Sequence, residues 1–266
     1  MLCFSHVSGS SLRVGDATLY YEVAGNPAGK PLVLLHGGLG SMADFQPILD
    51  KLPAEFRLIG IDFRGHGRST LGSAPLTYQQ YQADVECVLD HLGVQSCSLL
   101  GFSDGGIVAY RLAAQTPARV AALVTVGAQW RLETGSPVFQ MLSGLTAEMW
   151  TEMFPESVDY YRSVNPAPGF DALVQAVVGL WTDLGDTGYP NESVADIAAP
   201  MLIVRGDDDP LLSLHEAVEL QEKVAAAHFA NVPFAGHEVH KDAPALFAAM
   251  LGDFLLHPQP RRQLEA

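Results

Sequence analysis

The chain has 266 residues, of which 48% are apolar and 17% charged, and this length and composition suit one large domain with a substantial buried core. Thirty acidic against fifteen basic residues leave a formal net charge of −15 at pH 7. A surface this acidic repels phosphate backbones and anionic lipid, so we expect neither a nucleic-acid partner nor a membrane partner.

Strand and helix patterns alternate over the first 126 residues. Short apolar runs indicate strands that are covered on both faces, as in a parallel sheet, and apolar residues at helical spacing indicate the segments between them. In chain order the patterns predict an exposed edge strand at 19–23, a strand at 32–35, a helix through Ile48 and Leu52, a strand at 56–61, a helix at 78–92, a strand at 97–102, a helix at 107–114 and a strand at 120–126.

The alternation stops near residue 130. Residues 130–195 contain all three tryptophans, several prolines and helical stretches, but no strand pattern. The alternation of strands and helices then resumes with a predicted strand at 200–204, a helix at 214–224, a strand at 228–232 and a last helix at about 243–256. We therefore expect an α/β core made of residues 1–129 and 196–266, with a helical insertion at 130–195.

The strongest chemical signal is a G-x-S-x-G sequence at residues 101–105, followed by Gly106. It lies between a predicted strand and a predicted helix, which is the context of a nucleophile elbow. The small neighbours leave room for a strained turn that exposes Ser103. The sequence therefore predicts that Ser103 is a nucleophile, and the alternative is an ordinary turn capped by a serine.

A serine hydroxyl is a weak nucleophile, so it needs a base that is itself oriented by an acid. Three aspartates at 207–209 follow the predicted strand at 200–204, and His237 follows the last predicted strand. The order serine, aspartate, histidine is the one that elbow-type hydrolases use. His237 is thus the candidate base, and one of the three aspartates is the candidate acid.

An oxyanion hole is expected from a loop after an early strand together with the amide that follows the nucleophile. The loop His36-Gly37-Gly38 has this position. We expect the backbone amides of Gly38 and Asp104 to bind the oxyanion. The side chain of His36 is expected to brace the loop.

Five short segments, in their order along the chain, make the sequence similar to the α/β-hydrolase fold superfamily, in its serine-nucleophile branch with a helical cap. They are residues 36–38, 62–69, the Ser103 elbow, 206–209 and 236–237. The resemblance implies a mostly parallel, eight-stranded sheet flanked by helices, and a cap or lid at 130–195. It also selects Asp209 as the acid, because the family's acid stands three residues after a glycine, here Gly206.

Two further residues are candidates for binding the substrate. Asp104 makes the elbow resemble the valacyclovir hydrolase-like subgroup, which implies that its carboxylate receives a substrate ammonium. The alternative is that Asp104 points away and braces the turn. Trp130 lies near the end of a predicted strand and is the best candidate among the aromatic residues for lining a pocket.

Rival patterns are weaker. Residues 38–43 and Asp62 fit a dinucleotide fingerprint, but Pro47 interrupts the required helix, and H-E-V-H at 237–240 lacks the spacing of a zinc motif. We therefore expect no cofactor and no metal. Three unclustered cysteines indicate free thiols in a reducing compartment, and no apolar run approaches the roughly 18 residues of a membrane span, so we expect a soluble cytoplasmic protein.

The sequence thus predicts a serine hydrolase that cleaves a carboxylic ester, or a related acyl bond, of a small molecule through an acyl-enzyme. Ser103 attacks, His237 takes the proton and Asp209 orients the histidine. Carbon–carbon hydrolysis, lactone opening, acyl transfer and perhydrolysis use the same residues and stay open. A ligand sensor without catalysis is the alternative from another class. The sequence defines neither the substrate nor the oligomeric state.

Overall fold

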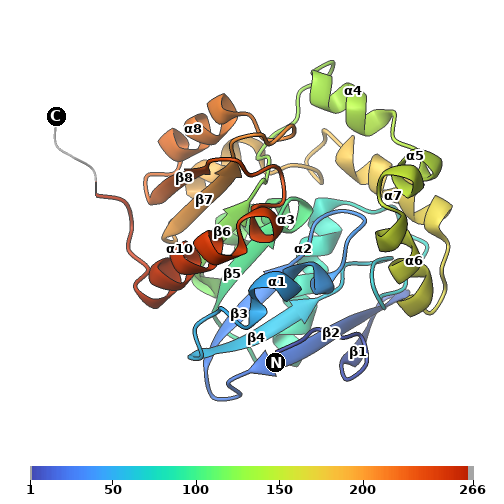
Figure 1. Cartoon of the computed structure of the whole chain (residues 1–266), viewed down its shortest axis with the longest axis horizontal. Helices are drawn as coiled ribbons and strands as arrows, with labels where there is room; N and C mark the ends of the chain where they lie inside the picture. Colours follow the sequence, from blue (N-terminus) through green and yellow to red (C-terminus); the bar gives the residue numbers. More distant parts are fainter. Residues whose placement is uncertain (1, 263–266) are drawn as a thin grey trace.

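Short apolar runs form the strands of one sheet in the computed structural model, which describes residues 2–262 (Figure 1). The eight strands are β1 Ser10–Val14, β2 Ala17–Gly25, β3 Lys30–Leu35, β4 Phe56–Ile61, β5 Cys97–Phe102, β6 Val120–Val126, β7 Met201–Gly206 and β8 Ala227–Val232. Their order is β1-β2-β4-β3-β5-β6-β7-β8. β3 to β8 are parallel, whereas β1 and β2 pair antiparallel. The mostly parallel sheet is confirmed.

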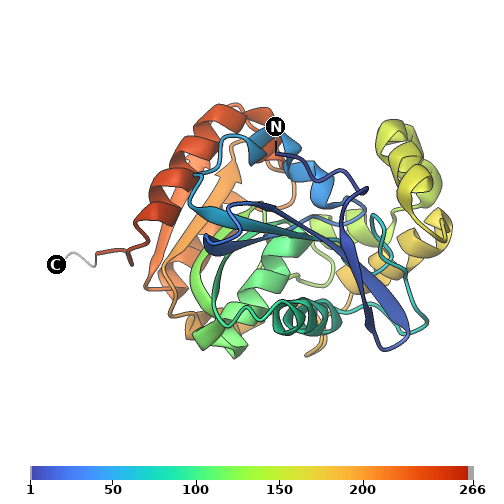
Figure 2. The same ribbon diagram turned by 90° about the horizontal axis from the view of Figure 1, so that it is seen from below.

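Helices cover both faces of this sheet. Their bounds are α1 Gln46–Leu49, α2 Tyr78–His91, α3 Asp104–Gln115, α8 Leu214–Lys223, α9 Val239–Asp242 and α10 Pro244–Leu256. Alternate residues of the central strands point into two apolar clusters, one shared with α2, α3 and α8 and the other with α1 and α10. Figure 2 shows α2 and α3 on one side of the sheet and α10 on the other. This double cover explains why every residue of β5 and β7 is buried.

Two local predictions were wrong. The strand predicted at 19–23 is not an edge strand, because β1 pairs along it from Ser10 to Val14 and forms the edge. β1 is mostly exposed and its sequence, SSLRV, is too polar to show an apolar pattern. The helix predicted through Leu52 ends at Leu49 and consists of α1 and a preceding 3₁₀ turn at Met42–Phe45.

The segment between β6 and β7 contains helices only, within the described residues. They are α4 Pro137–Ser143, α5 Ala147–Met153, α6 Pro155–Val164, α7 Phe170–Trp181 and a 3₁₀ segment at Asn191–Asp196. Because β6 and β7 are neighbours in the sheet, the chain leaves and re-enters the core at adjacent strands. α4 to α7 gather on one side of the molecule (Figure 1, right). We call residues 130–195 the insertion, and its role as a cap stays a prediction.

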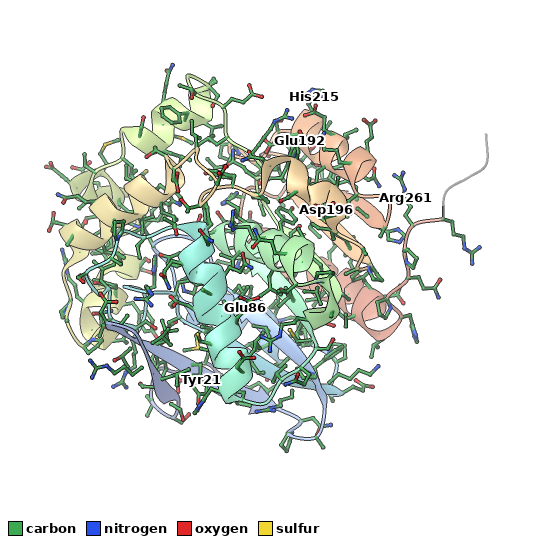
Figure 3. All side chains as sticks on the ribbon, turned by 180° about the vertical axis from the view of Figure 1, so that it is seen from behind. Tyr21, Glu86, Glu192, Asp196, His215 and Arg261 are labelled. Carbon is green, nitrogen blue, oxygen red and sulfur yellow. The ribbon has the colours of Figure 1, made fainter. Side chains whose placement is uncertain are left out.

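Several acidic side chains lie on the face opposite the view of Figure 1. Figure 3 shows Glu86 on α2, together with Glu192 and Asp196 of the 3₁₀ segment, on this face. Glu192 forms an ion pair with Lys223 at 2.8 Å. Among residues 2–262, no helix has both the length and the apolar character that a membrane crossing requires.

Candidate active site

Ser103 occupies a strained turn between β5 and α3. Its φ is +49° and its ψ is −116°, a conformation that side chains other than glycine rarely adopt. The turn packs tightly, because a β-carbon on Gly105 would clash with the carbonyl oxygen of Leu35, and one on Gly101 would clash with the backbone of Gly105. The glycines of the motif therefore allow β5 and α3 to approach, and Ser103 is left half-buried at the wall of a cavity.

His237 and Asp209 are in direct contact. Nδ1 of His237 lies 3.0 and 3.1 Å from the two carboxylate oxygens of Asp209. The Asp209 side chain is fully buried, and its Oδ1 also accepts hydrogen bonds from the amides of Leu211 and Leu212. With a carboxylate at Nδ1, the neutral imidazole carries its proton there, which leaves Nε2 as a proton acceptor. This is the arrangement that a general base requires.

The two other aspartates of the run have different surroundings. Asp207 and Asp208 are exposed, and Asp207 accepts a hydrogen bond from the side-chain amide of Asn231. Of the three, Asp209 is therefore the one that the structure brings to His237.

Gly127, directly after β6, is a site residue that the sequence analysis missed. Its φ is +58°, and a β-carbon there would lie 2.8 Å from Nδ1 of His237 and 3.0 Å from Oδ2 of Asp209. A side chain at this position would push the histidine and the aspartate apart. The available signal was a glycine at the carboxyl end of a predicted central strand, next to the strand that carries the acid.

The His36-Gly37-Gly38 loop packs against the elbow. A β-carbon on Gly37 would lie 3.3 Å from Cβ of Ser103, and one on Gly38 would lie 2.6 Å from Oδ2 of Asp104. His36 is buried and braces the loop, with Nε2 accepting from the Phe63 amide at 3.0 Å and Nδ1 donating to the Gly37 carbonyl at 2.7 Å. Burial lowers the pKa of its imidazole, which keeps the ring neutral.

The amides of Gly38 and Asp104 are suited to an oxyanion. Asp104 is the first residue of α3, where amides have no acceptor within the helix and the helix dipole favours negative charge. Gly38 stands on the adjoining loop, packed against Asp104. Both residues line the same cavity as Ser103 and His237, so the four predicted groups meet at one place.

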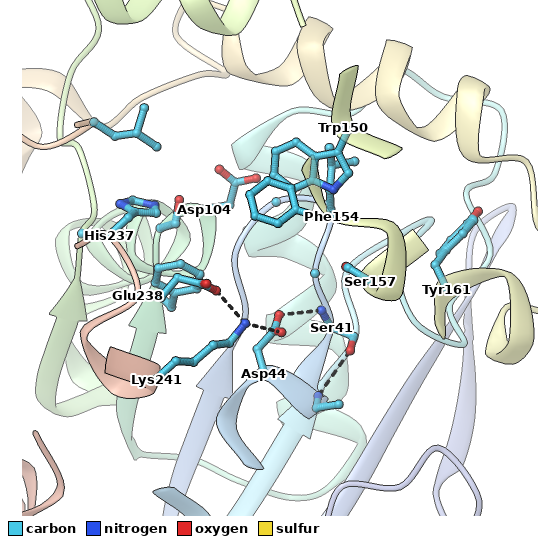
Figure 4. Close-up of a pocket in the computed structure, with 18 of the residues that line it drawn as sticks. Ser41, Asp44, Asp104, Trp150, Phe154, Ser157, Tyr161, His237, Glu238 and Lys241 are labelled. Carbon is cyan, nitrogen blue, oxygen red and sulfur yellow. Dashed lines mark hydrogen bonds and ion pairs between the residues drawn. The ribbon is translucent and has the colours of Figure 1, made fainter. Parts of the chain in front are cut away.

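The cavity measures about 970 Å³, which is large for a small-molecule site. The insertion supplies an apolar wall, made of Met141, Leu142, Leu145, Met149, Trp150, Met153, Phe154 and Trp181. Figure 4 shows His237 and Asp104 of the core and Trp150 and Phe154 of the insertion among the residues that line this cavity. The cavity can thus hold an apolar group close to the candidate nucleophile.

The structure corrects the expectation for Trp130. Its side chain is fully buried outside the cavity, with Nε1 3.3 Å from the carbonyl oxygen of Glu216 and the Arg131 guanidinium stacked 4.3 Å from the ring centre. Trp150 and Trp181 line the cavity instead. A position near a strand end does not tell on which side of the chain a ring points, and Trp130 points into the core.

A polar wall of the cavity comes from the core. Lys241 lies 2.9 Å from Asp44 and 2.6 Å from Glu238, so its amine is engaged by two carboxylates (Figure 4). Within the described lining, carboxyl groups outnumber amines, because the single amine of Lys241 compares with the carboxyl groups of Asp44, Asp104, Glu238 and Asp242 from the core and of Glu156 from the insertion. We therefore expect the lining to disfavour anionic ligands.

The second histidine of the H-E-V-H sequence, His240, does not reach the cavity. It is fully buried against Phe45 and Phe102, and its ring nitrogens have no polar partner among the described residues. Among residues 2–262, no group of three or more His, Cys, Asp and Glu side chains has the arrangement to hold a metal ion.

The Asp104 carboxylate lines the cavity but is almost completely buried. Oδ1 accepts from the Tyr78 hydroxyl at 2.9 Å, and the Trp181 indole donates to both oxygens at 2.9 and 3.0 Å. Burial raises its pKa from 3.8 to about 6, against the hydrogen bonds from Tyr78 and Trp181 and the charge of His237, which lower it. Its ionised form is thus held by neutral donors, without an amine or guanidinium partner in the described chain.

An Asp104→Asn variant is expected to be more stable than the parent protein at neutral pH. A carboxyl with a raised pKa in the folded state destabilises the fold as the pH rises from 3.8 to about 6 and above. The shift in the pKa of Asp104 corresponds to a change in the free energy of unfolding of about 3 kcal/mol at most, or roughly 5–10 °C in Tm. Thermal unfolding should show a gain in Tm at pH 4 that is only about a fifth of the gain at pH 7.5, because the carboxyl in the unfolded chain is already more than half ionised at pH 4. An equal gain at both pH values would contradict this ionisation.

Comparisons with known proteins agree with this fold. Residues 30–149 match a family described as the alpha/beta hydrolase fold. The chain is 29% identical to the putative carbamate hydrolase RutD of Azorhizobium caulinodans, over 90% of this chain and 96% of that protein. It is 27% identical to the serine hydrolase BPHL of Mus musculus, over 94% and 87%. A crystal structure of a hydrolase from Pseudomonas aeruginosa superimposes with a TM-score of 0.79 at 23% identity, over 94% of this chain and 99% of that one.

Proposed function

We propose that this chain, which has the α/β-hydrolase fold, is a serine hydrolase which cleaves the carboxylic ester of a small molecule through an acyl-enzyme. The observation that carries this proposal is the contact between His237 and buried Asp209, since His237 lines the same cavity as Ser103 in its strained turn. The fold alone would not define an activity.

The reaction follows from these groups. Ser103 Oγ attacks the ester carbonyl while Nε2 of His237 takes its proton, and Asp209 stabilises the imidazolium that forms. The amides of Gly38 and Asp104 donate to the oxyanion of the tetrahedral intermediate. His237 then gives its proton to the leaving alcohol and activates a water molecule, which hydrolyses the acyl-enzyme. The same steps would open a lactone or cleave a carbamate, the bond named in the RutD relative.

We assign the insertion, residues 130–195, the role of a cap. Its methionine, leucine and tryptophan side chains form the apolar wall of the cavity, so an apolar acyl or alcohol group would bury its surface against them. Methionine and leucine side chains adapt to ligands of different shape. This wall favours substrates with an apolar part over small, fully polar esters.

The proposal is tested with p-nitrophenyl esters from acetate to octanoate. We expect turnover, with kcat/KM rising from acetate to butyrate or hexanoate as the acyl group fills the apolar wall, by about threefold to tenfold per added pair of methylenes. Including one α-amino acyl ester tests whether Asp104 receives an ammonium group. A folded protein that hydrolyses none of these esters would contradict the proposal.

The charge of the cavity gives a sharper prediction. p-Nitrophenyl butyrate is expected to have a kcat/KM at least about tenfold above that of p-nitrophenyl hemisuccinate, because the extra carboxylate of the hemisuccinate meets the carboxyl groups of the lining. These are Asp44, Asp104, Glu156, Glu238 and Asp242, which we call the acidic wall. The methyl ester of the hemisuccinate is the matched control, since it is longer but neutral, and it should react nearly as well as the butyrate. Equal rates for the butyrate and the hemisuccinate would show that the acidic wall does not act on the substrate.

A further inference from the structure

Trp181 is placed where the insertion meets the catalytic core. It is the last residue of α7 and is 7% exposed, and its backbone carbonyl accepts a hydrogen bond from the Tyr189 hydroxyl at 3.1 Å. Its indole Nε1 donates to both carboxylate oxygens of Asp104, the residue after the candidate nucleophile. Contacts at both its backbone and its side chain therefore fix this tryptophan.

The ring of Trp181 also packs on Gly38. A β-carbon on Gly38 would lie 2.6 Å from Cζ2 of Trp181 and 2.6 Å from Oδ2 of Asp104. The indole and the carboxylate thus press on the same side of Gly38. One side chain of the insertion consequently touches both residues whose amides are assigned to the oxyanion.

A second donor holds Asp104 from the core. The Tyr78 hydroxyl, on α2, donates to Oδ1 of Asp104, and the Tyr78 ring packs edge-on against Tyr189 at 5.2 Å between centroids. Asp104 is therefore held between α2 of the core and α7 of the insertion. If the indole donor were removed, only the Tyr78 hydroxyl would hold the carboxylate, which could then shift against Gly38 and bring its unneutralised charge toward the oxyanion.

We propose that Trp181 is a positioning residue which sets the geometry of the oxyanion hole from the insertion. The inference rests on the proposed function, because it concerns the amides of Gly38 and Asp104 in ester hydrolysis. Oxyanion stabilisation depends on donors that are already in place to within fractions of an ångström. The insertion would then control the rate of the chemical step as well as the shape of the pocket.

The test is Trp181→Phe, which keeps a ring against Gly38 and removes the N–H donor. We expect kcat for p-nitrophenyl butyrate to fall about tenfold with KM changed by less than about twofold, as for the loss of a group that orients a catalytic one. Trp130→Phe is the matched control, because it removes an indole N–H that is buried outside the cavity, and it should keep the parent kcat.

A double-mutant cycle separates this role from direct contact with the substrate. If Trp181 acts through Asp104, Trp181→Phe should change kcat by less than about twofold in an Asp104→Ala background. A tenfold loss in that background would overturn the proposal, as would an unchanged kcat in the single variant. Should Trp181→Phe fold poorly, Tyr189→Phe loosens the same tryptophan at its backbone and should lower kcat in the same direction.

The Ser103→Ala variant distinguishes a failure of the proposed function from a failure of the role proposed for Trp181. If this variant keeps the parent activity, the proposed function fails and the role of Trp181 fails with it. If Ser103→Ala is inactive while Trp181→Phe is as active as the parent protein, the proposed function stands and the inference about Trp181 is wrong.

Discussion

Replacing Ser103 by Ala is expected to lower kcat for p-nitrophenyl butyrate by about 10⁴- to 10⁶-fold, with little effect on stability. The alanine removes the only atom that would bond to the substrate carbonyl, while the amides of Gly38 and Asp104 stay in place. The residual rate should reflect the binding of the ester and the stabilisation of its oxyanion during attack by water.

Steady-state hydrolysis and thermal unfolding of the same preparations check this result. The positive φ of Ser103 persists with alanine, so the variant should unfold within about 2 °C of the parent protein. Ser163→Ala, an exposed serine on α6, is the matched control and should keep full activity. A folded Ser103→Ala variant that retains more than about a hundredth of the parent rate would assign the nucleophile elsewhere.

The second large effect is expected at the acid. Asp209→Asn should lower kcat by about 10³- to 10⁴-fold, because an asparagine cannot stabilise the imidazolium and its amide can donate to Nδ1, which places the ring proton on Nε2. Nε2 could then no longer accept the proton of Ser103. KM should change little, since Asp209 is buried behind His237 and does not belong to the apolar wall.

The neighbouring aspartates provide matched controls for this substitution. Asp207→Asn and Asp208→Asn make the same chemical change at exposed positions one and two residues away, and each should keep kcat within about twofold. The pH dependence and kcat of the three variants, measured side by side, assign the acid. A loss at Asp207 or Asp208 as large as that at Asp209 would contradict the assignment.

The central strands were predictable because their environment leaves a strong local signal. β3, β5, β6 and β7 are covered on both faces, so their sequences are continuous apolar runs bounded by turns. β1 has no such signal, since an exposed edge strand needs only backbone pairing with its neighbour, and the residues of SSLRV suit solvent as well as a sheet.

The site was predictable where it depends on strand ends and order along the chain. Ser103, Asp209 and His237 each follow a strand, and the carboxyl ends of parallel strands meet at one edge of the sheet. From the residues alone, any of the three aspartates at 207–209 could be the acid, and the resemblance to a family selected Asp209. The buried contact with His237 adds a physical reason, because it engages the Asp209 carboxylate directly.

The choice among the tryptophans could not be made from the sequence. Trp181 reaches Asp104 across 77 residues, and Trp130 reaches Glu216 across 86. Contacts of this length depend on how the insertion packs on the core, which leaves no periodic pattern in either segment. The same reason hid Tyr78, which looks like any other apolar residue of an amphipathic helix.

The central claim is that Ser103 forms a covalent acyl-enzyme with the help of His237. The most direct measurement is mass spectrometry of the protein after incubation with an ethyl p-nitrophenyl alkylphosphonate, a neutral diester whose phosphorus is attacked by an activated serine with loss of p-nitrophenolate, which leaves a stable adduct. We predict one adduct per chain, on the peptide that contains Ser103, and none in the Ser103→Ala or His237→Ala variant. An adduct on another residue, or full ester hydrolysis by a protein that the phosphonate neither labels nor inhibits, would contradict the account.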